Sequence, residues 1–260
     1  MKEERVLING LETNYKIAGS GPAILLLHGW GGSSSSWVKI QEILGKKGYQ
    51  VIVPDFPGFG KSADPFDPWG VKEYVEFVFQ FVKELKLNSF FLLGHSFGGR
   101  IAIKFSALYP EKVLRLVLVD SAGVEREKNL SLKQKIMLTW SRRLGYFIVT
   151  MPVLKKLYPL FRRIAYILVG TRDYYLIKSP VMKETFKKII EEDLTDYLPM
   201  IKVKTLIIWG EKDRLTPISI AHLLKEKITG SELEVMPGIG HNPHLQSPKQ
   251  LSEIILKFFK

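Results

Sequence analysis

The stretch that decides the fold reads Phe90-Phe91-Leu92-Leu93-Gly94-His95-Ser96-Phe97-Gly98-Gly99-Arg100. Its apolar residues, bounded by glycine, predict a buried strand, and the pattern from Arg100 to Tyr109 predicts a helix. Ser96 then lies on a sharp, strained turn between the two, where a nucleophilic serine would sit. The glycines around it leave room for the crossing helix and strand. We therefore interpret Ser96 as a nucleophile, with a plain loop serine as the alternative.

The amino-acid composition limits the classes of protein to which the chain can belong. The chain has 260 residues, of which 46% are hydrophobic, so it can bury a sizeable core. It begins without the apolar segment of a signal peptide and has no apolar run of roughly 20 residues, so we expect a soluble, cytoplasmic protein. The absence of cysteine excludes disulfides, thiolate zinc sites and cysteine nucleophiles. The histidines show no metal-pair spacing, and we expect no metal and no cofactor.

The formal net charge of +12 is unevenly distributed. Between Arg126 and Arg163 stand ten basic residues and one acidic residue, among apolar residues at helical spacing. This pattern indicates a basic amphipathic surface rather than a nucleic-acid groove reader, so we expect no nucleic-acid partner. An ordinary solvated surface is the favoured interpretation. Weak contact with an anionic surface, without stable membrane insertion, is the alternative. We expect a monomer or a homodimer.

Strands and helices alternate along most of the chain. The patterns predict strands over 6–8, 13–17, 23–27, 49–53, 90–93, 113–119, 204–209 and 233–236, and helices over 37–47, 71–87, 100–109, 180–192, 218–227 and 248–260. Asn9-Gly10 predicts a hairpin between the first two strands. Thr216 is expected to cap the helix that follows Pro217, and Ser247 to open a capping box. The alternation predicts a mostly parallel sheet with crossover helices.

The alternation stops after residue 123, where long helical patterns take over. We therefore predict three segments: the first part of an α/β core over 1–122, a helical cap or lid over 123–198, and the second part of the core over 199–260. Trp140 and Phe147 would lie on an apolar inner face of the lid and contact substrate. The alternative is that the lid aromatics only hold the lid together.

Asp213 and His241 both follow predicted strands, as Ser96 does. The carboxyl ends of parallel strands share one edge of a sheet, so these three residues can meet there. A serine needs a base, and the base needs a carboxylate to orient it. Asp120 competes with Asp213 for the acid, and His244 competes with His241 for the base.

The glycine-rich loop His28-Gly29-Trp30-Gly31-Gly32 also follows a central strand. Its Trp30 amide, paired with the amide of Phe97, fits an oxyanion hole, because the helix after Ser96 points its positive end there. His28 is expected to organise the loop through its ring, and Asp55 to bind backbone amides in the turn cluster 55–62. His28, His95 and His244 are also kept as candidates for the substrate pocket.

Together these motifs resemble the serine hydrolases of the α/β-hydrolase superfamily over essentially the whole chain outside the insertion. The motifs that carry the resemblance are His28–Gly32, Asp55–Ser62, Gly94–Gly99, Gly210–Pro217 and Gly240–His244. The resemblance implies an eight-stranded α/β-hydrolase fold with a helical cap, Ser96 as nucleophile, Asp213 as orienting acid, His241 as base, and the Trp30 and Phe97 amides as the oxyanion hole. Many relatives carry a glutamate at the position of Gln246, so a salt bridge that anchors this loop is in doubt.

A serine nucleophile disfavours the dehalogenases and epoxide hydrolases of this fold, which use aspartate. The resemblance therefore implies cleavage of a small-molecule carboxylic ester, with a short- to medium-chain acyl group or a monoacylglycerol as substrate, through an acyl-enzyme. One alternative is a C–C bond hydrolase of ring-cleavage diketones. The other is a non-catalytic, ligand-binding member of the fold.

Overall fold

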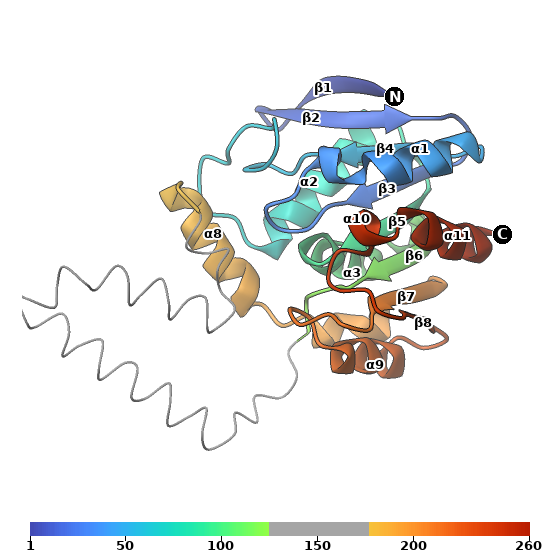
Figure 1. The fold of residues 1–260 in the computed structure, drawn as a ribbon. Helices are drawn as coiled ribbons and strands as arrows, with labels where there is room; N and C mark the ends of the chain where they lie inside the picture. Colours follow the sequence, from blue (N-terminus) through green and yellow to red (C-terminus); the bar gives the residue numbers. More distant parts are fainter. Residues whose placement is uncertain (125–176) are drawn as a thin grey trace, which may run out of the picture. The chain divides into compact units, whose positions relative to one another are not determined.

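The protein is described by a computed structural model over residues 1–124 and 177–260 (Figure 1). Its contacts divide the chain into two compact units. One unit joins Met1–Val124 to Pro180–Lys260, and the other is Glu125–Ser179. The second unit falls inside the segment 123–198 that the sequence assigns to a helical cap. Every element named below belongs to the first unit.

The first unit is built on one eight-stranded sheet. Its strands are β1 (Lys2–Ile8), β2 (Leu11–Ala18), β3 (Ala23–Leu27), β4 (Gln50–Pro54), β5 (Phe90–His95), β6 (Val113–Val119), β7 (Thr205–Gly210) and β8 (Glu232–Met236). Their order is β1-β2-β4-β3-β5-β6-β7-β8. β2 is antiparallel to both β1 and β4, and all other neighbours are parallel. The predicted eight-stranded, mostly parallel sheet is confirmed.

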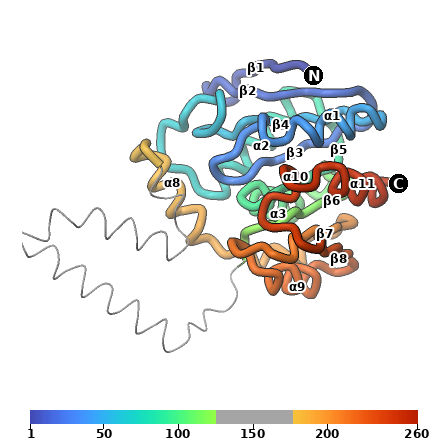
Figure 2. The backbone as a smooth tube through the Cα atoms, in the orientation of Figure 1, coloured from blue at the N-terminus to red at the C-terminus, as the bar shows by residue number. Residues whose placement is uncertain are grey.

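Helices cover both faces of the sheet (Figure 2). They are α1 (Val38–Lys46), α2 (Val71–Glu84), α3 (Phe97–Leu108), α9 (Ile218–Lys227) and α11 (Pro248–Phe259). In β3, Ile24 and Leu26 pack in the core under α1 and α11, whereas Leu25 and Leu27 pack in the core under α2, α3 and α9. Both faces of this strand are therefore buried away from solvent, which explains its uninterrupted run of apolar residues. None of the helices in the described ranges has the length and apolar character to cross a bilayer.

The two predicted helix caps differ from the structure in different ways. Pro217, not Thr216, is the N-cap of α9. Ser247 is the N-cap of α11, as predicted, but its side chain makes no capping hydrogen bond. The Thr216 hydroxyl donates instead to Asp213, and the Ser247 hydroxyl donates to Gln250 Oε1 at 3.2 Å. In both cases the hydroxyl donates to a side-chain acceptor and does not cap the helix as the local sequence pattern predicts.

Helix α8 (Pro180–Glu191) and the 3-10 turn Thr195–Met200 belong to the first unit, although the sequence pattern places them in the cap. The amide of Trp69 donates to the Thr185 hydroxyl at 2.9 Å. After the helix, the carboxylate of Glu192 accepts from Lys104 Nζ at 2.5 Å. These contacts hold α8 against the loop before α2 and the following turn against α3. The division between the two units accordingly falls near Ser179.

The crossing of α3 over the sheet depends on close backbone approach at glycines. A Cβ on Gly98 would lie 2.2 Å from the carbonyl oxygen of Leu27, and one on Gly94 would lie 2.5 Å from the carbonyl oxygen of Gly98. Both clashes are with backbone, which cannot rotate away. The turn between β5 and α3 therefore has room for no side chain at these positions.

We expect Gly98→Ala to lower the free energy of unfolding by at least about 2 kcal/mol, because overpacking forces the backbone of β3 or α3 to move. The measurement is urea unfolding followed by circular dichroism. Gly70→Ala is the matched control, since its Cβ would meet only the end of the Glu73 side chain, at 3.2 Å. Equal losses in the two variants would contradict this account of the turn.

Candidate active site

Ser96 occupies the sharp turn between β5 and α3, with φ 50° and ψ −113°. A non-glycine residue at this positive φ is strained and is kept there only by its surroundings. Its amide donates to the carbonyl of Val119 at 3.1 Å, and its carbonyl accepts from the amide of Ala122 at 3.1 Å. The end of β6 therefore fixes the backbone on which the Ser96 hydroxyl is presented.

Three side chains that are remote in sequence form one chain of hydrogen bonds. His241 Nε2 lies 3.0 Å from the Ser96 hydroxyl, and His241 Nδ1 lies 2.7 Å from Asp213 Oδ2. The residues come from the turn after β5 and the loops after β7 and β8. The Asp213 side chain is fully buried, and the His241 side chain is 12% exposed. The imidazole can therefore donate from Nδ1 to the carboxylate and accept the serine proton at Nε2.

Hydrogen-bond donors around Asp213 stabilise the ionised form of its carboxyl group. The amides of Leu215 and Thr216 donate to Oδ1 at 2.8 and 3.0 Å, and the Thr216 hydroxyl donates to Oδ2 at 2.5 Å. Burial alone would raise the pKa of Asp213, but the hydrogen bonds from His241 and Thr216 outweigh it and lower the pKa. Thr216 is a residue of this site that the sequence analysis assigned to a helix cap.

Asp120, the rival acid, has a different environment. It is completely buried, its Oδ1 accepts from the amide of Gly210 at 2.8 Å, and its Oδ2 has no partner among the described residues. Burial and the nearby Asp213 raise the pKa of Asp120 to about 8. Its backbone, with φ 41°, is strained as well. The structure places Asp213, not Asp120, against the imidazole of His241.

The residues predicted for the oxyanion hole lie beside Ser96. A Cβ on Gly29 would lie 3.4 Å from Ser96 Cβ, and the rings of Trp30 and Phe97 contact each other edge to face at 5.4 Å. Phe97 is the first residue of α3, so its amide has no acceptor within the helix. The Trp30 amide has no backbone acceptor within residues 1–124 and 177–260. Neither N–H group therefore has a backbone acceptor within the described ranges.

His28 and Asp55 organise the loop that carries Trp30. His28 Nε2 accepts from the amide of Phe56 at 3.0 Å, and its Nδ1 lies 2.8 Å from the carbonyl of Gly29. Burial lowers the pKa of His28 to about 4, which keeps Nε2 free to accept. The Asp55 carboxylate accepts from the amides of Ser34 and Lys61 at 2.6 and 2.9 Å. These are the structural roles expected for both residues.

The histidines considered for substrate binding lie in the interior. His28, His95 and His244 are 0%, 4% and 3% exposed, so their rings pack against protein rather than line a surface. His244 stacks on Trp37 with ring centroids 4.2 Å apart. Trp140, Phe147 and the basic segment 126–163 lie outside the described residues. Gln246 ends the short helix α10 (Pro243–Gln246), and its Oε1 accepts from the amide of Gly240 at 2.8 Å, so an amide anchors the loop that carries His241.

Two aromatic residues that the sequence analysis did not select lie close to the predicted oxyanion loop. The ring of Trp30 contacts the ring of Phe59 at 4.8 Å and that of Phe186, on α8, at 4.9 Å. All three side chains are half-buried. The apolar periodicity of α8 selects Phe186 only as part of a helix face. Nothing in that pattern indicates which face turns toward Trp30.

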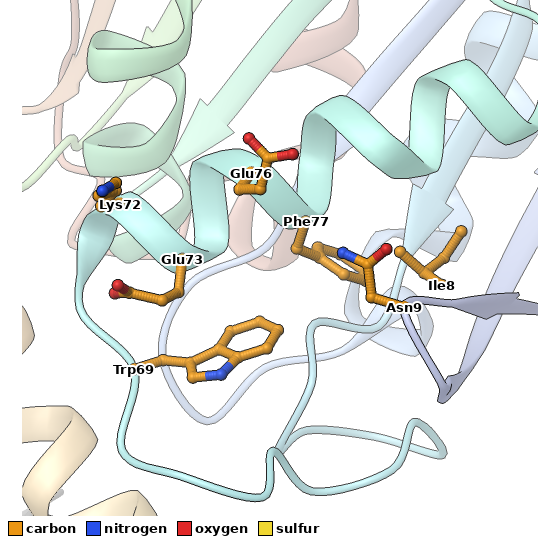
Figure 3. A pocket seen from close by; sticks show the side chains of 7 residues that line it. All are labelled: Ile8, Asn9, Trp69, Lys72, Glu73, Glu76 and Phe77. Carbon is orange, nitrogen blue, oxygen red and sulfur yellow. The ribbon is translucent and has the colours of Figure 1, made fainter.

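A separate cavity of about 240 Å³ lies between the β1–β2 turn and α2 (Figure 3). Its lining is Ile8, Asn9, Trp69, Lys72, Glu73, Glu76 and Phe77, which includes none of the three hydrogen-bonded residues above. The ring of Trp69 contacts Tyr74 at 5.0 Å, and Tyr74 contacts Phe97 at 5.0 Å. The wall of this cavity is thus packed, through aromatic rings, against the turn that carries Ser96.

In the part of the chain that the structure describes, no group of three or more His, Asp or Glu side chains could hold a metal ion.

The sequence matches the model of the alpha/beta hydrolase fold family over residues 22–148 and 169–248. It is 29% identical to monoacylglycerol lipase ABHD6 of Rattus norvegicus over 256 residues, which are 92% of this chain and 76% of that protein. It is 25% identical to 2-hydroxy-6-oxo-2,4-heptadienoate hydrolase of Pseudomonas putida over 264 residues, 97% of this chain and 94% of that protein. The solved structure of a membrane phospholipase A, a bacterial virulence factor, has a TM-score of 0.76 at 26% identity and covers 99% of this chain and 85% of its own.

Thr216→Val should slow the reaction of Ser96 with a fluorophosphonate by roughly tenfold, because a hydrogen bond to a charged group contributes about 1.5–3 kcal/mol and 1.4 kcal/mol corresponds to tenfold. The measurement is the second-order labelling rate. Thr216→Ser keeps the hydroxyl and is the control, with a rate close to wild type. A Val variant that labels as fast as the Ser variant would show that Asp213 does not depend on this donor.

Asp120→Asn should flatten the pH dependence of stability. The folded protein keeps a proton on Asp120 up to a pKa of about 8, against an ordinary value of 3.8. Between these values the folded state binds more protons than the unfolded state, so the wild type loses stability as pH rises through this window. The asparagine variant has no such titration. Denaturant unfolding across this range measures it, with the exposed Asp67→Asn as control, and an unchanged slope in Asp120→Asn would contradict the assignment.

Proposed function

Because the chain belongs to the alpha/beta hydrolase fold family, we propose that it is a serine hydrolase that cleaves carboxylic esters through an acyl-enzyme. The observation that carries the proposal is the continuous set of hydrogen bonds from Ser96 through His241 to Asp213, at distances of 3.0 and 2.7 Å. Ser96 lies on a strained turn, and the nearby amides of Trp30 and Phe97 have no backbone acceptor among the described residues. Acyl transfer requires a nucleophile, a base and an orienting acid in such relative positions, which supports the proposal.

In the proposed reaction, Ser96 Oγ attacks the ester carbonyl while its proton passes to His241 Nε2. Asp213 stabilises the imidazolium, and the amides of Trp30 and Phe97 donate to the oxyanion of the tetrahedral intermediate. His241 then gives the proton to the departing alcohol, which leaves an acyl group on Ser96. A water molecule, deprotonated by the same imidazole, releases the acid and restores the serine.

We propose short- to medium-chain acyl esters or monoacylglycerols as substrates. Two features support this class. Trp30, Phe59 and Phe186 form a half-buried aromatic cluster in contact with Phe97, an apolar surface beside Ser96. The relatives include a monoacylglycerol lipase that aligns with 92% of this chain.

A second candidate is hydrolysis of a C–C bond in a ring-cleavage diketone. It is favoured by the similarity to the 2-hydroxy-6-oxo-2,4-heptadienoate hydrolase, which spans nearly the full length of both proteins. The same serine, histidine and aspartate would serve either reaction. The two differ in the leaving group, which is an alcohol for an ester and a carbon acid for a diketone.

Wild-type protein should react with a fluorophosphonate and hydrolyse p-nitrophenyl esters, and Ser96→Ala should lose labelling and about a millionfold in kcat. A series of acyl-chain lengths then defines the acyl preference, and a ring-cleavage diketone tests the second candidate. The exposed Ser35→Ala is the control and should behave as wild type. Wild-type protein that neither labels nor turns over any of these substrates would favour a ligand-binding member of the fold.

A further inference from the structure

His95 is a buried imidazole that directly precedes Ser96 at the end of β5. Its Nε2 lies 2.7 Å from the backbone carbonyl oxygen of His241, to which it can only donate. Burial, followed by the neighbouring His244 and His241, holds the pKa of His95 well below its usual value. A neutral ring with its proton on Nε2 satisfies this carbonyl. The residue before the nucleophile is thus hydrogen-bonded to the residue predicted as the base.

The other edge of the same ring packs against the loop that carries Trp30. A Cβ on Gly29 would lie 2.8 Å from His95 Nδ1 and 3.2 Å from its Cε1. Position 29 therefore has no room for a side chain while the ring of His95 stays in place. Since Trp30 follows Gly29, the ring also limits where the Trp30 amide can lie.

Neighbouring rings hold His95 in this orientation. His95 contacts His244 edge to face at 4.6 Å and Trp37 at 5.9 Å, and His244 stacks on Trp37. A side chain that is closely packed on all sides is restricted to one rotamer. The imidazole can thus act as a rigid spacer between the loops it touches.

We propose that His95 is a positioning residue that sets the loop of the base and the loop of the oxyanion amide relative to the nucleophile. This inference rests on the proposed function, and it assigns His95 a role other than contact with substrate. His95 reaches the loop of the base through the carbonyl of His241 and the oxyanion loop through the backbone of Gly29, and Ser96 is its covalent neighbour. Misplacement of reacting groups by about 1 Å can cost about a hundredfold in rate, so such a spacer would act on kcat.

The test is a matched pair of variants. His95→Leu removes the donor and keeps an apolar side chain of similar size, whereas His95→Gln can still donate to the carbonyl of His241. With a p-nitrophenyl ester, we expect His95→Leu to lower kcat by about ten- to a hundredfold with KM nearly unchanged, and His95→Gln to regain most of the loss. A Leu variant with wild-type kcat would overturn the proposal, as would equal losses in both variants.

Hydrogen–deuterium exchange of residues 238–246 provides a readout that does not depend on catalysis. Exchange in this segment should be faster in His95→Leu than in wild type or His95→Gln. Unchanged exchange would overturn the proposed positioning role of His95, even if the protein hydrolyses no ester tested.

If His95→Leu does not fold, Gly29→Ala takes its place, because its Cβ would press on the His95 ring. Gly29→Ala should lower kcat with KM nearly unchanged, and a wild-type kcat would overturn the proposal. Failure of the proposed function itself would show separately, as wild-type protein that does not react at Ser96.

Discussion

The structure depends on one strained residue. Ser96 has a positive φ that an L-amino acid rarely adopts, and close contacts on every side keep it there. Gly98 lies under the end of β3, and Gly94 lies under α3. Val119, the last residue of β6, accepts from the Ser96 amide, and Ala122, shortly after β6, donates to the Ser96 carbonyl. The same contacts that impose the strain bring β3, β5 and β6 together at one edge. The contacts that pack these strands into the core therefore also hold the backbone from which the serine hydroxyl projects.

Much of this architecture could be predicted from the sequence because it follows from local patterns. The apolar runs of β3, β5 and β6 indicate strands covered on both faces, and Asn9-Gly10 indicates the hairpin of β1 and β2. The order of the motifs around Ser96, Asp213 and His241 placed all three after strand ends. Parallel strands then bring them to one edge, and the structure has them within hydrogen-bond distance.

The features that could not be predicted depend on contacts between distant residues. A threonine before Pro217 has the local pattern of a helix cap, and only the folded chain places its hydroxyl against Asp213. The apolar face of α8 indicates a helix but not the surface on which Thr185 meets Trp69. His95, His244 and Trp37 are far apart in sequence, so their ring contacts carry no local signal. Local patterns therefore predicted the three side chains that the structure joins by hydrogen bonds, but not the contacts that support them.

Electrostatics explains why only one of two adjacent acids can serve the histidine. Asp120 and Asp213 follow neighbouring strands and are both buried, and two carboxylates placed close together in a core do not both ionise. Among the described residues, the Asp213 carboxylate accepts four hydrogen bonds, whereas the Asp120 carboxylate accepts one. The charge therefore resides on Asp213, which is hydrogen-bonded to the imidazole of His241. Burial, and then the charge of Asp213, raise the pKa of Asp120, so the pair carries one negative charge, where acyl transfer at Ser96 would need it.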